Sequence, residues 1–254
     1  MADKGTAAAM IEVARKEVGY VEGPKDNETK YGAFTKVNFS PWCGSFLMWC
    51  ANQAGVKIPN TVYTPNGVAA FKKAKTWANA ADAHPQPGDL VYFSFVPAAT
   101  PSSPVQHVGL VVKDNGDGTI TTIEGNTTRD GAKGSQDNGG ECALKIRGYK
   151  VNNKRHIWSS VVGFGRPDYS DVAEANPTAP APAKAIPAFP GPIKPGDKGE
   201  NVKLIQHALT LVEDGDYGPA TKKAVVAFQD NHDILDSNGI VGPKTWDALM
   251  KTAL

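Results

Sequence analysis

The sequence predicts an α+β domain with an antiparallel sheet, followed by a small all-α domain of three helices. Three observations predict this division. Helical patterns precede strand patterns in residues 1–168, residues 169–195 are rich in proline and alanine, and residues 196–254 contain an internal repeat. Helices followed by a run of strands are typical of α+β domains. A chain of 254 residues is long enough for a core of useful depth in at least one domain.

In the first domain, residues 6–18 predict a helix because their apolar positions recur on one side. After a polar stretch, residues 40–55 predict a second helix, with Cys43 near its start and Gly55 as its stop. Four strand patterns follow, over residues 89–95, 107–112, 118–125 and 161–165.

The proline-rich residues 175–196 predict a semi-rigid spacer in the polyproline II conformation, at about 3 Å per residue. Beyond it, residues 214–224 and 238–248 repeat at an offset of 24 residues. Each copy is a glycine turn that leads into a helix with proline in its first turn. Helical spacing before and between the two copies predicts three short helices.

Composition and charge exclude several classes of protein. The chain is 41% hydrophobic and 21% charged, which is ordinary for a soluble globular protein. No stretch approaches the roughly 18 to 20 apolar residues of a membrane span, and the first twenty residues lack a standard secretory signal. Lys and Arg outnumber Asp and Glu by 19 to 15 in residues 1–168, whereas residues 196–254 have 6 against 9. Such a mild imbalance predicts no nucleic-acid partner, but it suits weak attraction to an anionic polymer.

Three cysteines are too few for a disulfide-stapled scaffold. If Cys43 and Cys50 share one helix, they lie about 10 Å apart at ~1.5 Å rise per residue, beyond the roughly 7 Å limit for a disulfide. We therefore expect Cys43 to be a free thiol at the start of a helix. There the helix dipole favours a thiolate, and unsatisfied N–H groups can hold an oxyanion.

His107 begins a strand that turns through residues 114–118 into the strand containing Glu124 and Asn126. In antiparallel strands, the numbers of opposite residues have a constant sum. A four-residue loop gives a sum of 231 and sets His107 directly opposite Glu124, whereas a sum of 233 sets it opposite Asn126. An even sum would place Glu124 and Asn126 on the opposite face of the sheet from His107. The register of this hairpin therefore tests whether the predicted site can form.

A thiolate, a histidine base and a group that orients the imidazole form a cysteine acyl-transfer site. Taken singly, each residue has a structural explanation: Cys43 as a small buried hydrophobe, His107 as a satisfied strand-end histidine, Glu124 as a solvated strand residue. Their combination favours catalysis.

Residues 7–168 resemble the CHAP family, the cysteine, histidine-dependent amidohydrolases/peptidases of papain-like fold found in phage lysins and bacterial wall hydrolases. The motifs that carry the resemblance are residues 29–32, 41–43, 87–91, 107–109 and 123–126. The resemblance implies Cys43 as nucleophile, His107 as general base and acid, Glu124 as the carboxylate that orients the imidazole, and Asn126 as a supporting polar group. Tyr31 and Trp42, in the same motifs, are expected to bind substrate. A long loop over residues 96–106, just before His107, departs from the family pattern. The family pattern therefore does not define the shape of the active-site groove beside this loop.

Residues 195–254 resemble the peptidoglycan-binding type 1 module, through the glycine turns and the residues around Gln206 and Gln229. On this resemblance, Asp214, Tyr217 and Trp246 are expected to contact the cell wall. A generic three-helix dimerisation or docking unit is the alternative.

No cofactor is predicted. The sequence has no HExxH and no paired Cys-x-x-Cys, which disfavours a zinc amidase. The acidic run over residues 114–118 is better explained as a hairpin turn than as a calcium loop. Some relatives bind calcium in the loop that here holds Asp26 and Asn27, but this sequence offers too few neighbouring carboxylates to predict a calcium site.

Both resemblances imply a cysteine peptidoglycan hydrolase joined by a spacer to a wall-binding module. The start of the chain favours a phage endolysin, made in the host cytoplasm and acting on the wall after release at lysis. We expect a monomer that acts on peptidoglycan, without nucleic acid or membrane insertion. The favoured bond is the N-acetylmuramoyl-L-alanine amide. The alternatives are a peptide bond in the stem or cross-bridge, and a non-catalytic wall-binding protein.

Overall fold

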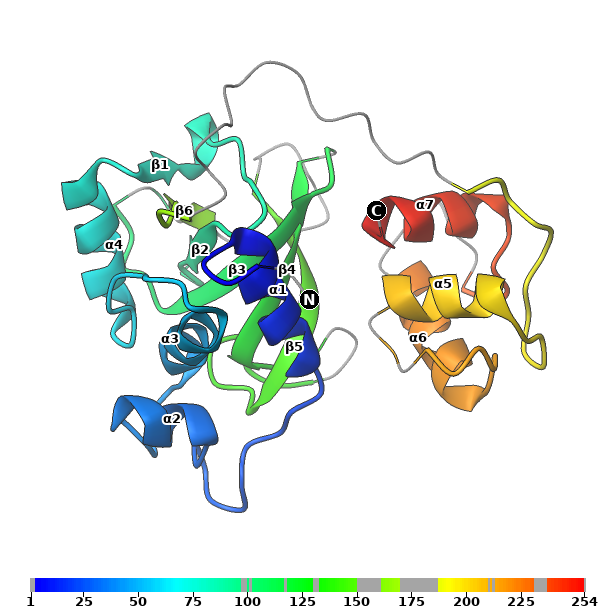
Figure 1. Cartoon of the computed structure of the whole chain (residues 1–254), viewed down its shortest axis with the longest axis horizontal. Helices are drawn as coiled ribbons and strands as arrows, with labels where there is room; N and C mark the ends of the chain where they lie inside the picture. The colour runs from blue at the N-terminus through cyan, green and yellow to red at the C-terminus, as the bar shows by residue number, and fades with distance from the viewer. Residues whose placement is uncertain are drawn as a thin grey trace. The chain divides into compact units, whose positions relative to one another are not determined.

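The structure is a computed structural model that forms two compact units, residues 1–175 and 176–254 (Figure 1). The boundary between them falls inside the predicted spacer. The residues that the structure describes are 3–96, 100, 102–116, 118–129, 133–149, 161–169, 187–209, 211, 213–230 and 237–253. Most of the predicted spacer, residues 170–186, lies outside them.

An antiparallel sheet and the helices that pack on it form the N-terminal unit, as predicted. Within the described residues, the sheet has six strands in the order β1-β6-β2-β3-β4-β5. The strands are β1 (Trp77–Asn79), β2 (Leu90–Phe93), β3 (His107–Asp114), β4 (Thr119–Thr127), β5 (Glu141–Gly148) and β6 (Val161–Gly165). The helices are α1 (Ala7–Lys16), α2 (Lys30–Thr35), α3 (Cys43–Ala54) and α4 (Thr64–Ala74), with a 3₁₀ turn η1 (Ala80–Asp82) after β1.

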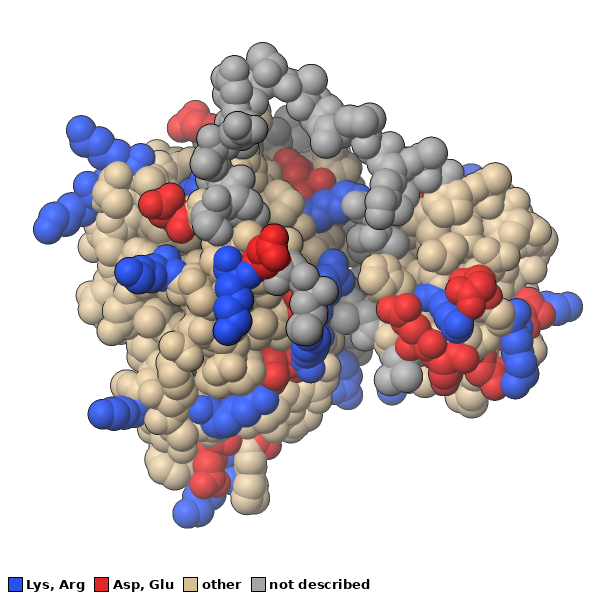
Figure 2. All heavy atoms as spheres, in the orientation of Figure 1, with Lys and Arg blue, Asp and Glu red and all other residues tan. Residues whose placement is uncertain are grey.

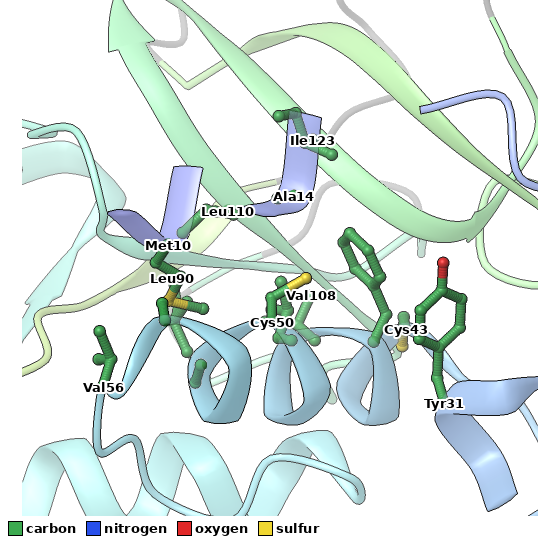
Figure 3. Close-up of a cluster of buried hydrophobic side chains, with 14 of the residues drawn as sticks. Met10, Ala14, Tyr31, Cys43, Cys50, Val56, Leu90, Val108, Leu110 and Ile123 are labelled. Atoms are coloured by element: carbon green, nitrogen blue, oxygen red, sulfur yellow. The ribbon is translucent and has the colours of Figure 1, made fainter. Parts of the chain in front are cut away.

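Helix α3 is the central helix of this unit and packs against β3 and β4. Figure 3 shows Cys43 and Cys50 on the face of α3 that meets the sheet, near Val108, Leu110 and Ile123. The helix ends where the sequence predicts, because Gly55 adopts a left-handed φ of 70° and its N–H bonds back to the last turn. Apolar burial therefore fixes α3 to the strands that carry the polar residues of the predicted site.

Tyr169 completes the N-terminal unit. Its ring is buried and its hydroxyl donates to the Gly88 carbonyl at 2.7 Å. Gly88 has a φ of 93°, and a Cβ there would lie 2.7 Å from the Ala7 side chain. This turn into β2 therefore needs glycine for both its conformation and the close approach of α1.

The C-terminal unit contains α5 (Glu200–Ala208), α6 (Pro219–Asp230) and α7 (Pro243–Ala253). The sequence repeat is also a structural repeat. The Gly215 N–H donates to Gln206 Oε1 at 2.8 Å, and the Gly239 N–H donates to Gln229 Oε1 at 2.9 Å. In each copy a buried glutamine thus holds the glycine turn that precedes the next helix.

This unit begins earlier in the chain than predicted. The Trp246 indole donates to the Pro187 carbonyl at 2.8 Å, the Phe189 ring packs on it, and Ile193 pairs with Val241. These residues of the predicted spacer belong to the helical core. The prolines and alanines around Phe189 and Ile193 are typical of a spacer, so the sequence did not indicate that these two residues contribute to the core.

Charge differs between the two units. On the face shown in Figure 2, acidic side chains gather on the C-terminal unit, which has 6 basic and 9 acidic residues over 196–254. In the view of Figure 2, basic and acidic side chains are interspersed over the N-terminal unit. None of the helices in the described ranges is long and apolar enough to cross a membrane.

Candidate active site

A β-bulge in the β3–β4 hairpin decides which residues face one another. Near the turn, Asp114 pairs with Ile120, so the residue numbers sum to 234, whereas Leu110 pairs with Ile123, which gives 233. The extra residue lies between Val111 and Lys113. Without the shift, the even register would put the side chains predicted to form the site on opposite faces.

Near His107 the register sum is therefore 233, the second of the two odd sums that the sequence allowed, and not 231. A sum of 233 places Gly109 opposite Glu124. The Glu124 side chain lies across Gly109 and reaches His107 diagonally, with 3.0 Å between Oε2 and the imidazole Nε2. Both side chains are fully buried.

Gly109 makes this diagonal contact possible. A Cβ built on Gly109 would lie 2.7 Å from Glu124 Cγ, so any side chain would displace the carboxylate. We predict that Gly109→Ala lowers the rate of the cysteine acyl transfer expected at this site at least about tenfold, because a shift of about 1 Å in a positioning group has effects of this order. Clearing of a cell-wall suspension measures the rate. A folded Gly109→Ala variant with the parent rate would contradict this role.

Arg147 holds the other side of the Glu124 carboxylate, a role that nothing in the local sequence pattern indicates. Its Nε donates to Glu124 Oε1 at 2.8 Å and its Nη2 to Oε2 at 2.5 Å, a bidentate pair buried under the sheet edge. The Thr122 hydroxyl adds a third donor at 2.6 Å. Burial alone would raise the pKa of Glu124, but the charge and hydrogen bonds of Arg147, then those of His107, hold this pKa well below its usual range.

Two aromatic rings pack around these charged groups. The Arg147 guanidinium lies 5.2 Å from the Phe93 ring centre and 5.8 Å from that of Phe95. The His107 ring lies 5.7 Å and 5.9 Å from the same two centres. The rings of Phe93 and Phe95 thus hold the imidazole and the guanidinium in place through packing contacts that take no part in proton transfer.

Cys43 occupies the first position of α3, and its side chain is buried. The preceding Trp42 makes no side-chain cap, which leaves the positive end of the helix dipole directed at the thiol. The start of α3 is tightly enclosed, because a Cβ on Gly44 would lie 1.9 Å from the Thr61 carbonyl oxygen.

The imidazole of His107 lies beside Cys43. Burial lowers the pKa of His107, but the neighbouring Cys43 sulfur and then Glu124 outweigh burial and raise this pKa to about 9. Nε2 is taken by Glu124, while Nδ1 has no hydrogen-bond partner among the described residues. Nδ1 is therefore the nitrogen free to exchange a proton with the thiol. The structure brings together Cys43, His107 and Glu124.

Asn126, expected to be a supporting polar group, makes its hydrogen bonds to neighbouring loop residues. It has a left-handed φ of 58°, at a register shift between β4 and β5. Its side-chain amide donates to Asn138 Oδ1 at 3.0 Å and Asn27 Oδ1 at 3.3 Å, and its Oδ1 accepts from the Gly140 N–H at 3.2 Å. Asn126 thus ties two loops together, and the residue in contact with the imidazole is Glu124.

Tyr31 and Trp42 are fully buried, so the expectation that they contact substrate is wrong. Their rings stack on each other with centres 5.2 Å apart. The Tyr31 hydroxyl donates to Glu17, and the Trp42 indole donates to Glu22 Oε2 at 2.9 Å. These aromatic residues position the start of α3 from within the core.

In the C-terminal unit, Tyr217 and Trp246 are also core residues, contrary to expectation. Tyr217 is 1% exposed and donates to the Gly239 carbonyl, and Trp246 is 2% exposed. Asp214 lies at the surface, where its Oδ1 accepts from the Gln206 amide and from the Asp216 N–H. Its carboxylate shapes the glycine turn, and because Asp214 is exposed, its expected wall contact stays a prediction.

In the part of the chain that the structure describes, no three or more His, Cys, Asp or Glu side chains gather in a group that could hold a metal ion. Asp26 accepts a hydrogen bond from the neighbouring Asn27 amide at 3.0 Å. Asp114 accepts from the Gly116 N–H and from the Tyr149 hydroxyl, as a hairpin turn residue does.

Comparison with known proteins identifies both units. Residues 35–126 match the CHAP domain family, and residues 198–249 match a peptidoglycan binding domain family. The chain is also similar to the zinc D-Ala-D-Ala carboxypeptidase of Streptomyces albus G, with 33% identity over 110 residues. That alignment covers 37% of this chain and 43% of the relative, so the chain spans less than half the length of that protein. The chain thus carries a CHAP domain in its N-terminal unit and a peptidoglycan-binding type 1 domain in its C-terminal unit.

Proposed function

We propose that the protein is a peptidoglycan hydrolase that uses Cys43 as a nucleophile. One observation carries the proposal: the imidazole of His107 bonds to a buried carboxylate through Nε2 and keeps Nδ1 free beside a thiol at a helix start. Histidine oriented in this way can activate a thiol. The two domain families, together with a relative named as a D-Ala-D-Ala carboxypeptidase, support peptidoglycan as the substrate.

The chemistry follows from the geometry. His107 Nδ1 accepts the proton of Cys43, and the thiolate attacks an amide carbonyl, whose developing oxyanion is stabilised by N–H groups in the first turn of α3. The imidazolium then protonates the leaving amine, and a thioester remains on Cys43. Water, deprotonated by His107, hydrolyses the thioester and restores the thiol. Glu124 stabilises the imidazolium throughout, and Arg147 keeps Glu124 ionised.

We further propose that the bond cleaved is the N-acetylmuramoyl-L-alanine amide and that the protein acts as a phage endolysin at lysis. Mass spectrometry of digested peptidoglycan tests the bond. Release of complete stem peptides that begin with L-alanine supports the amidase. New termini inside the stem or the cross-bridge would instead assign a cysteine endopeptidase, and intact walls after prolonged incubation would contradict hydrolysis.

The division into two units leads to a further prediction. Each unit has its own hydrophobic core, so a chain ended after Ala175 should keep its fold. We expect it to retain far-ultraviolet circular dichroism and cooperative thermal unfolding while losing most of its co-sedimentation with purified walls. Wall binding equal to that of the full chain would show that the N-terminal unit supplies the affinity.

A further inference from the structure

Several large apolar side chains are exposed in segments that lead into the first turn of α3, which begins with Cys43, or follow a residue that packs on it. Within the described residues, the exposed ones are Phe34, Val37, Phe39 and Tyr63, with Val21 and Ile240 elsewhere in the chain. Phe34 belongs to α2, and Val37 and Phe39 lie in the segment between α2 and α3. Binding residues are disproportionately found on surface loops that a rigid scaffold positions, so exposed aromatic rings in segments beside a candidate nucleophile are candidates for substrate contact.

Phe39 is the most informative of them. It has a φ of 60°, in the left-handed region that a bulky residue seldom adopts, and 56% of its surface is exposed. Glycine would adopt this backbone without strain, and the exposed ring gains little from burial. Strained backbone conformations of this kind cluster at functional sites. An aromatic ring that is largely exposed on such a backbone therefore points to a contact with something outside the chain.

Local contacts place Phe39 on one side of the first turn of α3. The Thr35 hydroxyl at the end of α2 lies 2.8 Å from the Ser45 hydroxyl, which joins this segment to the turn that begins with Cys43. The Phe39 N–H donates to the Asn27 carbonyl at 3.1 Å and fixes the backbone. Lys25 Nζ lies 5.8 Å from the centre of the Phe39 ring and adds positive charge.

Tyr63 belongs to a second segment that touches the same turn. Gly44, next to the thiol, packs against the Thr61 carbonyl so closely that a Cβ would lie 1.9 Å from it. Two residues further on, Tyr63 precedes α4 and is 66% exposed. Two different segments that contact the first turn of α3 thus each present an exposed aromatic ring.

We propose that Phe39 and Tyr63 are the residues that bind the sugar part of the substrate, by packing against the carbon–hydrogen face of the muramoyl ring. The inference rests on the proposed function. In the N-acetylmuramoyl-L-alanine amide, the sugar is joined to the scissile carbonyl through the short lactyl group, so a ring beside the nucleophile is within its reach. Flat aromatic side chains offer a large rigid area for such a contact, and Lys25 suits an anionic polymer.

Two soluble substrates with the same stem peptide test the proposal: an N-acetylmuramoyl peptide and an N-lactoyl peptide that lacks the sugar. For Phe39→Gly and for Tyr63→Ala in the full chain, we expect kcat/KM on the muramoyl peptide to fall about tenfold, mainly through KM. On the lactoyl peptide it should change less than about twofold. Phe39→Gly should unfold at the same temperature as the parent or higher, because glycine relieves the strained φ.

Two further variants act as controls. Phe39→Tyr keeps a ring and should retain parental kcat/KM, whereas Val21→Ala trims an apolar side chain of similar exposure (63%) and should leave both substrates unaffected. Equal losses on the two substrates would overturn the sugar contact, and so would parental values on both. If the parent cleaves only stem or cross-bridge peptides, the sugar inference fails while cysteine hydrolysis stands. If neither the parent nor Cys43→Ser releases any product, the proposed function itself fails.

Discussion

Replacement of Cys43 by serine is expected to stop wall hydrolysis on an assay timescale, with a loss of at least about three powers of ten in rate. The change nearly conserves volume at a buried position at the start of α3, so the fold should persist. A hydroxyl stays protonated at neutral pH even beside His107, and the nucleophile is lost. Turbidity clearing and release of new amine termini measure the rate.

Cys50→Ser is the matched control, because Cys50 is buried on the same face of the same helix. Burial raises the pKa of Cys50 well above its usual value, so this thiol stays protonated and serves packing. The serine should cost about 1 to 3 kcal/mol of unfolding free energy. The folded fraction should clear walls at the parental rate. Clearing by Cys43→Ser at the parental rate would rule out the cysteine mechanism.

Wall binding separates the two hypotheses about the whole protein. The peptidoglycan-binding unit has its own core, so Cys43→Ser should still sediment with purified walls as the parent does. A parent that binds walls and releases no amine termini would establish a non-catalytic wall-binding protein. Hydrolysis by the parent with retained binding by the variant supports a division of labour between the two units.

Elements whose apolar pattern faces a single core could be predicted from the sequence. Helix α3 (Cys43–Ala54) lies within the expected range 40–55 and stops before Gly55 as expected, since the glycine and the period of the apolar residues are both local signals. Strands β3 and β4 also lie where their β-branched residues indicate. The bulge between Val111 and Lys113 was not predictable, because nothing in a single strand reports how its partner is offset.

Strand β5 was missed for a physical reason. It contains Lys145 and Arg147, which resemble exposed positions, yet both are buried because Lys145 donates to the Thr128 carbonyl and Arg147 pairs with Glu124. A charged residue can be buried only when a partner is present, and the partner lies 23 residues away in the case of Arg147. Tyr31 and Trp42 show the opposite error, since aromatic residues in a catalytic motif proved to be part of the core.

Arg147→Met is expected to have the largest effect on stability. It removes the guanidinium and leaves the Glu124 carboxylate buried without its main partner, which typically costs about 3 to 5 kcal/mol. The pKa of Glu124 is lowered in the folded protein, so its contribution to stability is present above pH ~4.5 and is lost as the pH falls through the folded pKa. The deficit of Arg147→Met should therefore be largest near neutral pH and shrink in acid. Urea unfolding at several pH values measures it.

A double variant decides whether the Arg147–Glu124 ion pair or the packing of the Arg147 side chain accounts for the lost stability. Glu124→Gln with Arg147→Met removes both charges and should be more stable near neutral pH than Arg147→Met alone, because no unpaired carboxylate remains in the interior. Its hydrolysis should nevertheless stay far below the parental rate, since no carboxylate then stabilises the imidazolium of His107. If the double variant loses as much unfolding free energy as Arg147→Met and Glu124→Gln lose together, the loss comes from the contacts of Arg147 with Phe93 and Phe95. In that case Arg147 is a packing residue, and the lowered pKa of Glu124 is not what stabilises the site.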